Sequence, residues 1–227
     1  MKNLVILSGS GLSAESGIET FRGANGLWEK YDITKLANPE AWRTNRELVL
    51  RFYNERRKKI IEAEPNSAHK ILAELEKYFK VIIVTQNVDD FHERAGSTNI
   101  LHLHGEIRKS RSTKNPALIY QINGWELNSG DKCELGSQLR PHIVWFGEPV
   151  TKIEEAAQIV SKADIFIVIG TSLKVYPAAG LLTYTRTGIP KYLIDPEYVD
   201  HHGDFQHIKE KASIGLEFLK KTLIANC

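Results

Sequence analysis

The stretch that decides the fold reads Leu4-Val5-Ile6-Leu7-Ser8-Gly9-Ser10-Gly11-Leu12-Ser13-Ala14. An apolar run of strand length is followed at once by the pattern G-x-G-x-x-A. Two glycines one residue apart permit a tight turn and a close approach of the backbone to a pyrophosphate, and Ala14 is small enough to let a helix pack on the strand. Phosphate oxygens would then face the amides of that helix. A purely structural turn can carry the same glycines, so the rest of the chain has to decide between the two.

Four more apolar runs have the length and composition of buried parallel strands. They span residues 81–84, 143–146, 165–169 and 192–194. Helical patterns lie between several of them, at 67–78, 153–161 and 208–223. Strands that alternate with helices predict an α/β fold with a doubly wound, Rossmann-like parallel sheet.

Two regions interrupt this alternation. Residues 27–65 are mostly helical in pattern, and residues 105–142 are polar and rich in turn signals such as Asn115-Pro116 and Asn123-Gly124. Together they predict a smaller domain inserted twice into a larger one that comprises 1–26, 66–104 and 143–227. No acidic residue ends a second strand about 20 residues after the glycine loop, as in dinucleotide-dependent dehydrogenases. Nothing in the sequence therefore indicates hydride transfer.

Bulk composition narrows the classes of protein. The chain has 227 residues, 42% of them hydrophobic and 26% charged, which is typical of a soluble globular protein. A net charge of +2 is too small to indicate a specific nucleic-acid partner, and two cysteines exclude a disulfide framework. No run approaches the ~20 apolar residues of a membrane helix. We expect a cytoplasmic protein with no targeting segment and no membrane partner.

His104 is the first candidate for chemistry. It ends the run 100–104 directly before Gly105, and an imidazole at a strand end can act as a general base near neutral pH. A structural histidine is the alternative. His102 lies two residues earlier and is expected on the same strand face, in a structural or pocket-rim role. A metal-binding pair would need further ligands, and none are apparent.

Polar residues follow the 81–84 run, where a parallel strand presents its carboxyl end to ligands. They are Gln86, Asn87 and Asp89. Amide and carboxylate groups suit ribose hydroxyls and a carboxamide, and Asn87 or Asp89 can also cap a short helix over residues 91–94.

Taken together, four motifs resemble the sirtuins, the NAD-dependent protein deacylases, over residues 4–212. These are the opening glycine loop, Thr85-Gln86-Asn87-Val88-Asp89-Asp90, Leu103-His104-Gly105 and Gly170-Thr171-Ser172. The resemblance implies NAD as co-substrate and the acyl-lysine side chains of proteins as partners. It assigns His104 and Asn87 to catalysis, with His104 activating a ribose hydroxyl after nicotinamide departs. Phe21 would shield the reactive sugar carbon from water.

The resemblance also implies two sets of binding residues. The NAD-binding set is Gly9, Ser10, Gly11, Ser13, Ala14, Glu15, Phe21, Arg22, Trp28, Gln86, Asn87, Asp89, Gly170, Thr171, Ser172, Asp195, Pro196, Glu197 and Ala212. The substrate set, which would hold an acyl-lysine peptide as an added strand, is Ala37, Tyr53, Arg56, Val144, Phe146, Gly147, Glu148, Leu173 and Val175.

Tyr53 and Arg56 indicate which acyl group is removed. Three residues apart on a helix, they share a face, and a phenol with a guanidinium binds a carboxylate. An amphipathic surface helix is the alternative, since Arg56 begins a basic run, 56–59, that otherwise indicates a solvated face. Tyr-x-x-Arg matches the sirtuin subclass that removes succinyl, malonyl or glutaryl groups, and Ala37 matches a small residue that leaves room for them. We therefore expect a desuccinylase and demalonylase that also deacetylates.

The chain departs from the family at the zinc module. Many sirtuins place two Cys-x-x-Cys pairs between the catalytic histidine and the peptide-binding strand, whereas this interval has only Cys133, and Ser112 stands where a ligand cysteine is expected. One thiolate cannot form a four-ligand structural site, so we expect no zinc and a small domain held by packing.

Two other functions remain open at this point. One is an NAD-consuming ADP-ribosyltransferase or NAD hydrolase. The other is a non-catalytic module that binds NAD or acyl-lysine, against which the intact His104, Asn87 and Asp89 argue.

Overall fold

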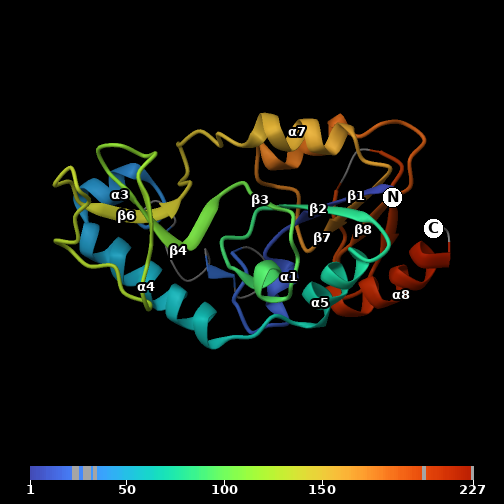
Figure 1. Cartoon of the computed structure of the whole chain (residues 1–227), viewed down its shortest axis with the longest axis horizontal. Helices are drawn as coiled ribbons and strands as arrows, with labels where there is room; N and C mark the ends of the chain where they lie inside the picture. Colours follow the sequence, from blue (N-terminus) through green and yellow to red (C-terminus); the bar gives the residue numbers. More distant parts are fainter. Residues whose placement is uncertain (22–25, 28–31, 33–34, 201–202, 226–227) are drawn as a thin grey trace.

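The computed structural model describes residues 1–21, 26–27, 32, 35–200 and 203–225. Two β-sheets lie at opposite ends of an elongated molecule (Figure 1). The larger sheet has six parallel strands, in the spatial order β3-β2-β1-β7-β8-β9. Their bounds are Asn3–Ser8 for β1, Lys80–Thr85 for β2, Ile100–His102 for β3, Ile165–Ile169 for β7, Lys191–Ile194 for β8 and Gln206–Ile208 for β9.

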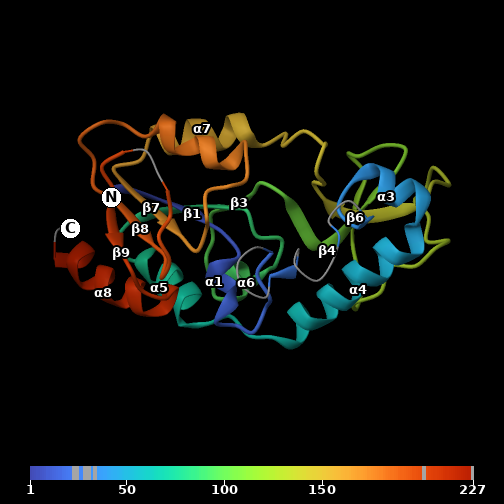
Figure 2. The same ribbon diagram turned by 180° about the vertical axis from the view of Figure 1, so that it is seen from behind.

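This strand order confirms the predicted doubly wound α/β fold. It is the order of a dinucleotide-binding sheet, and the direction of winding reverses between β1 and β7. Helices α5 (Ser67–Leu75) and α8 (Ala212–Ala225) cover one face, and α7 (Ile153–Ser161) with the 3-10 helix η2 (Ala178–Tyr184) covers the other (Figures 1 and 2).

The strands read as unbroken apolar runs because both faces of the sheet are covered. Along β1, Leu4 and Ile6 pack against α5 and α8, while Val5 and Leu7 pack on the α7 side; all four are fully buried. At about 25 cal/mol per Å² of apolar surface, such residues supply the main driving force for this part of the fold.

The smaller sheet is antiparallel and has three strands. They are β5 (Ile119–Gln121), β4 (Gly105–Ser112) and β6 (Leu139–Ile143), with β4 in the middle. Helices α3 (Pro39–Thr44) and α4 (Arg46–Glu62) lie against this sheet (Figure 1). Asn38 and Asn45 start these helices by accepting hydrogen bonds from the backbone amides of Ala41 and Leu48. Two further short helices, α1 (Gly11–Ala14) and α6 (Phe91–Arg94), follow β1 and β2.

The prediction of a buried parallel strand at 143–146 is wrong. Antiparallel β6 ends at Ile143, and the next residues lead into a turn outside the large sheet. The amide of Val144 donates to the His104 carbonyl, and the amide of Phe146 donates to the Ala37 carbonyl. Ile143 and Trp145 are buried but Phe146 is 43% exposed, so the segment buries only one of its sides.

Two helix boundaries also differ from the predicted ones. Helix α5 ends at Leu75, and α8 begins only at Ala212 because residues 206–208 pair with β8 as the edge strand β9. Strand β3 stops at His102, so His104 lies in the bend before β4. Within the part of the chain that the structure describes, no helix has the length and apolar character needed to cross a membrane.

Candidate active site

A cavity opens at the carboxyl ends of β1, β2 and β7, where they face the small sheet. Loops of the large sheet contribute glycine, hydroxyl, amide and imidazole groups, and the small-sheet side contributes aromatic and aliphatic groups. The lining residues are Gly9, Ser10, Phe21, Ala37, Tyr53, Gln86, Asn87, Val88, His104, Ile143, Val144, Trp145, Phe146, Gly147, Glu148, Val150, Thr171, Ser172, Val175, Tyr176 and Pro177. Ligands of open α/β sheets bind at this position, beside the reversal of strand order.

The glycines of the first loop are required by a close approach of two loops. A Cβ on Gly9 would lie 2.6 Å from the Thr171 Cβ, and one on Gly11 would lie 2.8 Å from the Gly170 Cα. The β1 and β7 loops thus meet directly, and the cavity lies on their shared surface. The packing role expected for Ala14 is wrong, because Ala14 is exposed and Leu12 and Ser13 are the buried residues of α1.

A hydrogen-bond network fixes Asn87 at the floor of the cavity. Its side-chain amide donates to the Gly9 carbonyl and to Ser13 Oγ, both at 3.1 Å, which leaves its Oδ1 for a ligand. Ser13 Oγ in turn donates to Asp89 Oδ2 at 3.0 Å. Asp89 is 4% exposed and lies behind the lining, where burial raises its pKa. Asp89 was also expected to cap the short helix over residues 91–94, and its Oδ1 accepts a 3.4 Å hydrogen bond from the Phe91 amide at the start of that helix.

His104 presents its imidazole to this cavity. Its Nδ1 lies 3.1 Å from the Gln86 carbonyl, an acceptor, so Nδ1 carries the proton and Nε2 is the basic nitrogen. Burial lowers the pKa of His104, partly offset by the Gln86 carbonyl, and the neutral ring therefore predominates near pH 7. His102 is 5% exposed and does not line the cavity. Of the two roles expected for it, this position favours a structural role over one at the rim of the pocket.

The end of the cavity next to the small sheet is aromatic. Tyr53 Oη accepts a 3.0 Å hydrogen bond from Trp145 Nε1, so its own proton is free to be donated to a ligand. Burial raises the pKa of Tyr53 to about 12, which keeps the phenol protonated. Ala37 lies in the same wall, and its small side chain leaves space beside Tyr53.

Arg56 lies one layer behind this wall. It is 7% exposed, its guanidinium carbon stands 4.4 Å from the centre of the Phe21 ring, and both Nη atoms approach the Glu19 carbonyl at 3.3 and 3.4 Å. Its Nε has no hydrogen-bond partner, and none of the described carboxylates forms an ion pair with it. Burial lowers the pKa of Arg56, which the charges of Asp89, Tyr53 and Glu19 only partly oppose.

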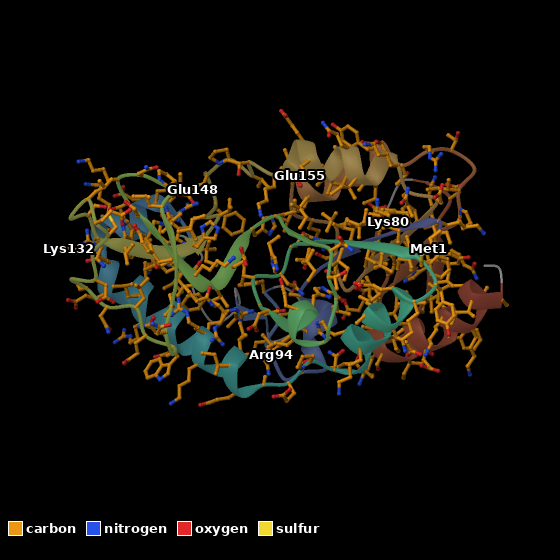
Figure 3. All side chains as sticks on the ribbon, viewed as in Figure 1. Met1, Lys80, Arg94, Lys132, Glu148 and Glu155 are labelled. Atoms are coloured by element: carbon orange, nitrogen blue, oxygen red, sulfur yellow. The ribbon has the colours of Figure 1, made fainter. Side chains whose placement is uncertain are left out.

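Arg140 offers a contrast. It is 8% exposed and stacks 3.3 Å from the centre of the Trp145 ring, but it forms bonds of 2.6 and 3.0 Å with the Glu148 carboxylate. Glu148 also pairs with Arg111 at 3.0 Å and accepts from the Trp145 amide, so it fixes the turn after β6 (labelled in Figure 3).

Several expected binding residues lie outside the cavity. Glu15 is committed elsewhere, since its carboxylate accepts from the amide and hydroxyl of Ser213 at the start of α8. Arg22 and Trp28 lie outside the described residues. The remaining expected residues that do not line the cavity are Gly11, Ser13, Ala14, Asp89, Gly170, Asp195, Pro196, Glu197 and Ala212 of the NAD set, and Arg56 and Leu173 of the substrate set.

Trp145 is the main lining residue that the sequence did not assign. It is 2% exposed, contacts Tyr53 and stacks on Arg140. The sequence signal that could have found Trp145 is its spacing from Ile143, because side chains two residues apart in a strand point to the same side. Val88, Ile143, Val150, Tyr176 and Pro177 were also unassigned.

Ser112 and Cys133, the two positions compared with zinc ligands from the sequence, form a hydrogen-bonded group with Ser137. Ser112 Oγ and Ser137 Oγ lie 2.8 Å apart, and Cys133 Sγ lies 3.4 and 3.1 Å from them. Among the described residues, no three His, Cys, Asp or Glu side chains form a group that could hold a metal ion. The absence of zinc stays a prediction.

The residues present fit NAD. A side chain at Gly9 or Gly170 would collide with the neighbouring loop, so the two loops can meet only if these residues are glycines. Hydroxyl and amide groups of Ser10, Gln86 and Thr171 line the cavity beside them, and this donor set suits phosphate and ribose oxygens. Asp195 follows β8 at the same edge of the sheet, outside the cavity.

Comparison with known proteins agrees with this geometry. Residues 9–177 match the Sir2 family. An "NAD-dependent protein deacylase" of Bacteroides thetaiotaomicron is 55% identical over 231 residues, with 99% of each chain covered. A solved Sir2 homologue–NAD complex superposes with a TM-score of 0.87 at 40% identity, covering 99% of this chain and 90% of that one.

A further solved Sir2 protein, in complex with a deacetylated peptide and 3′-O-acetyl ADP-ribose, has a TM-score of 0.82 at 29% identity, with 96% and 92% of the chains covered. The chain therefore belongs to the Sir2 family, as the motif resemblance implied.

Proposed function

We propose that this chain removes acyl groups from lysine side chains of proteins with NAD as co-substrate, and that it prefers acyl groups ending in a carboxylate, such as succinyl and malonyl. NAD, when bound, supplies the ribose carbon that accepts the acyl oxygen and the nicotinamide that leaves. One water molecule is consumed when the amide bond to lysine is broken, and the products are the free lysine, nicotinamide and an O-acyl-ADP-ribose. Family membership and similarity to named deacylases support the reaction class.

His104 acts as the base of the proposed reaction. Its Nδ1–H is held by the Gln86 carbonyl, and the neutral Nε2 is available to take a ribose hydroxyl proton. Asn87, held at Gly9 and Ser13, offers its Oδ1 as an acceptor beside the same space. Phe21 and Trp145 line the site with apolar surface and exclude water from the reacting atoms.

Arg56 carries the preference for acidic acyl groups. None of the described carboxylates lies within ion-pair distance of this buried cation, and the charges of Asp89 and Glu19 offset its burial only in part, so an incoming carboxylate would supply a direct partner. Tyr53 adds a free phenolic proton directly at the cavity wall. The Phe21 ring lines the cavity, and Arg56 lies behind that ring. The Phe21 ring therefore has to move aside before a carboxylate can reach the Arg56 guanidinium.

The decisive experiment compares matched succinyl-lysine and acetyl-lysine peptides by mass spectrometry, with and without NAD. We expect NAD-dependent loss of succinyl to be faster, and Arg56→Met to lower kcat/KM for the succinyl peptide about tenfold or more, the value of one charge-assisted hydrogen bond. Acetyl removal should change far less. Arg51→Met, an exposed arginine on the same helix, is the matched control and should change neither rate.

The other outcomes separate the alternatives. Faster removal of acetyl leaves the reaction class in place and rejects the role given to Tyr53 and Arg56. Free ADP-ribose, or an ADP-ribosylated protein, without deacylation indicates an NAD hydrolase or an ADP-ribosyltransferase. Folded protein that processes neither peptide nor NAD indicates a binding module.

A further inference from the structure

His102 is buried beside the active site, yet the proposed reaction makes no use of it. Its Nδ1 lies 2.9 Å from the Asn87 carbonyl oxygen, and its Nε2 lies 2.8 Å from Oε1 of Glu93 on α6. His104 holds the preceding carbonyl, that of Gln86. The two histidines of the H-x-H pair thus bind two consecutive peptide carbonyls of the loop that follows β2.

The partners of His102 determine its proton count. A carbonyl and a carboxylate are both acceptors, and a neutral imidazole has only one N–H, so the two bonds together require the imidazolium. Burial lowers the pKa of His102, but the Glu93 carboxylate, the Asn87 carbonyl and the charge of Glu106 on β4 outweigh it and raise the pKa above its ordinary value.

Two other histidines buried near His102 behave differently. Burial lowers the pKa of His92 on α6 well below its ordinary value, and lowers that of His69 on α5 to about 4. Asp89 also acts on His102, and its carboxylate favours the imidazolium. His102 is therefore the charged histidine of this group, and its charge depends chiefly on Glu93.

Asn87 is the residue that His102 holds in place. The Asn87 amide donates to Thr85 Oγ1 at 3.0 Å, and its side chain donates to Gly9 and Ser13. The bond from His102 holds the third polar group of Asn87, its backbone carbonyl. Losing that bond frees the peptide plane between Asn87 and Val88, both of which line the cavity.

We propose that His102, as an imidazolium paired with Glu93, is a positioning residue that sets the place of Asn87 in the cofactor site. The inference rests on the proposed function for its kinetic consequences only. When His102 loses a proton, one N–H remains for two acceptors, and the bond to either Asn87 or Glu93 is lost.

The pH dependence of kcat/KM tests this proposal. Activity needs neutral His104 and is lost as pH falls through its pKa, whereas it needs charged His102 and is lost as pH rises through the pKa of that residue. In Glu93→Gln a neutral amide replaces the carboxylate that opposes burial most, so the pKa of His102 falls and the alkaline limb moves to lower pH while the acid limb stays. Glu64→Gln, an exposed carboxylate paired with Arg94, is the matched control and should move neither limb.

Two measurements do not depend on deacylation. NMR titration of the His102 ring in the full chain should give a pKa above the ordinary imidazole value, and a lower one in Glu93→Gln. ADP-ribose should bind about tenfold more weakly to Glu93→Gln at a pH where His102 of the unaltered chain is still charged. These results remain informative if neither peptide is deacylated.

His102→Gln keeps one donor for the Asn87 carbonyl but removes the titrating group. In this variant the alkaline limb of the pH profile should no longer depend on Glu93. Thermal unfolding checks that the variant is folded. The proposal is overturned if the His102 ring of the unaltered chain titrates below its ordinary value, or if Glu93→Gln changes neither the pH limbs nor ADP-ribose affinity.

Discussion

Arg56 and Arg140 are both buried, and both act electrostatically on Tyr53, yet only one of them is paired. Arg140 meets the Glu148 carboxylate and stacks on Trp145, while Arg56 meets a backbone carbonyl and the face of Phe21. Residue type and burial are the same, so the difference in role comes from the counter-ion. A paired buried cation maintains the wall of the site, and an unpaired one is available to a ligand.

This difference predicts unequal effects on stability. Arg56→Met removes a buried charge that none of the described carboxylates pairs with directly, and Asp89 keeps its hydrogen bonds from Ser13 and the Phe91 amide, so we expect the free energy of unfolding to change by less than about 1 kcal/mol. Arg140→Met breaks a buried ion pair, leaves Arg111 as the remaining described cation at Glu148, and should cost about 3 kcal/mol. Urea unfolding at pH 7 measures both. Equal destabilisation in the two variants would mean that Arg56 is a structural residue, and the acidic-acyl proposal would lose its main support.

At the scale of elements, α4 anchors the small sheet and the loop around residue 126. Its Asn54 donates to the Leu127 carbonyl and accepts from the Leu127 amide, and Arg57 donates to the carbonyls of Ile107 and Trp125. Asn54 and Arg57 also bind each other at 2.8 Å. Two side chains one turn apart thus hold the small sheet and the loop around residue 126 on a single helix.

We expect Asn54→Ala to lower the free energy of unfolding by about 2 to 4 kcal/mol, because it leaves buried Leu127 and Arg57 groups without partners. Denaturation followed by circular dichroism measures this. Glu55→Ala, an exposed neighbour on α4, should change stability by less than about 0.5 kcal/mol.

A metal chelator added to the unaltered chain should leave its stability unchanged, because we expect no zinc and because Asn54 and Arg57 hold the small sheet on α4 by hydrogen bonds. A large loss of stability on chelation, with little effect of Asn54→Ala, would contradict this account and restore a structural metal.

Elements whose signals are local were predictable from sequence. The strands β1, β2, β7 and β8 and helix α7 follow apolar runs or periodicity within a few residues, and His104 and Asn87 follow compact motifs. The predictions that were wrong concern residues whose structure depends on partners far away in the sequence. Arg57 belongs to a run expected to be solvated, yet it is fully buried because residues 107 and 125 supply its acceptors. The run 143–146 pairs with residues 104 and 37, which no local pattern indicates.

At the scale of the whole molecule, one apolar cluster connects the two sheets. Ile18 comes from the segment after β1, and Val88 and Phe91 come from the segment after β2. These three side chains pack in one cluster with Ile107 and Trp145 of the small-sheet part. Arg94 on α6 extends this link by donating to the Ile60 and Ala63 carbonyls at the end of α4 (labelled in Figure 3). Because the cavity is lined from both parts, its geometry depends on this shared core.

Continuity of the core predicts one cooperative unfolding transition. In Trp28→Phe the tryptophans that remain, Trp42, Trp125 and Trp145, belong to the small-sheet part, so fluorescence reports on that end, whereas far-UV circular dichroism reports on both ends. We expect the two signals to give the same midpoint in urea.

ADP-ribose at about 100 times its Kd should raise both midpoints together, by an amount equivalent to about 2.7 kcal/mol. In Asn54→Ala both should fall together. A fluorescence transition that precedes the circular dichroism transition, and that ADP-ribose does not shift, would show that the small sheet unfolds alone. The shared core would then be too weak to shape the cavity, and substrate binding itself would have to bring the two walls together.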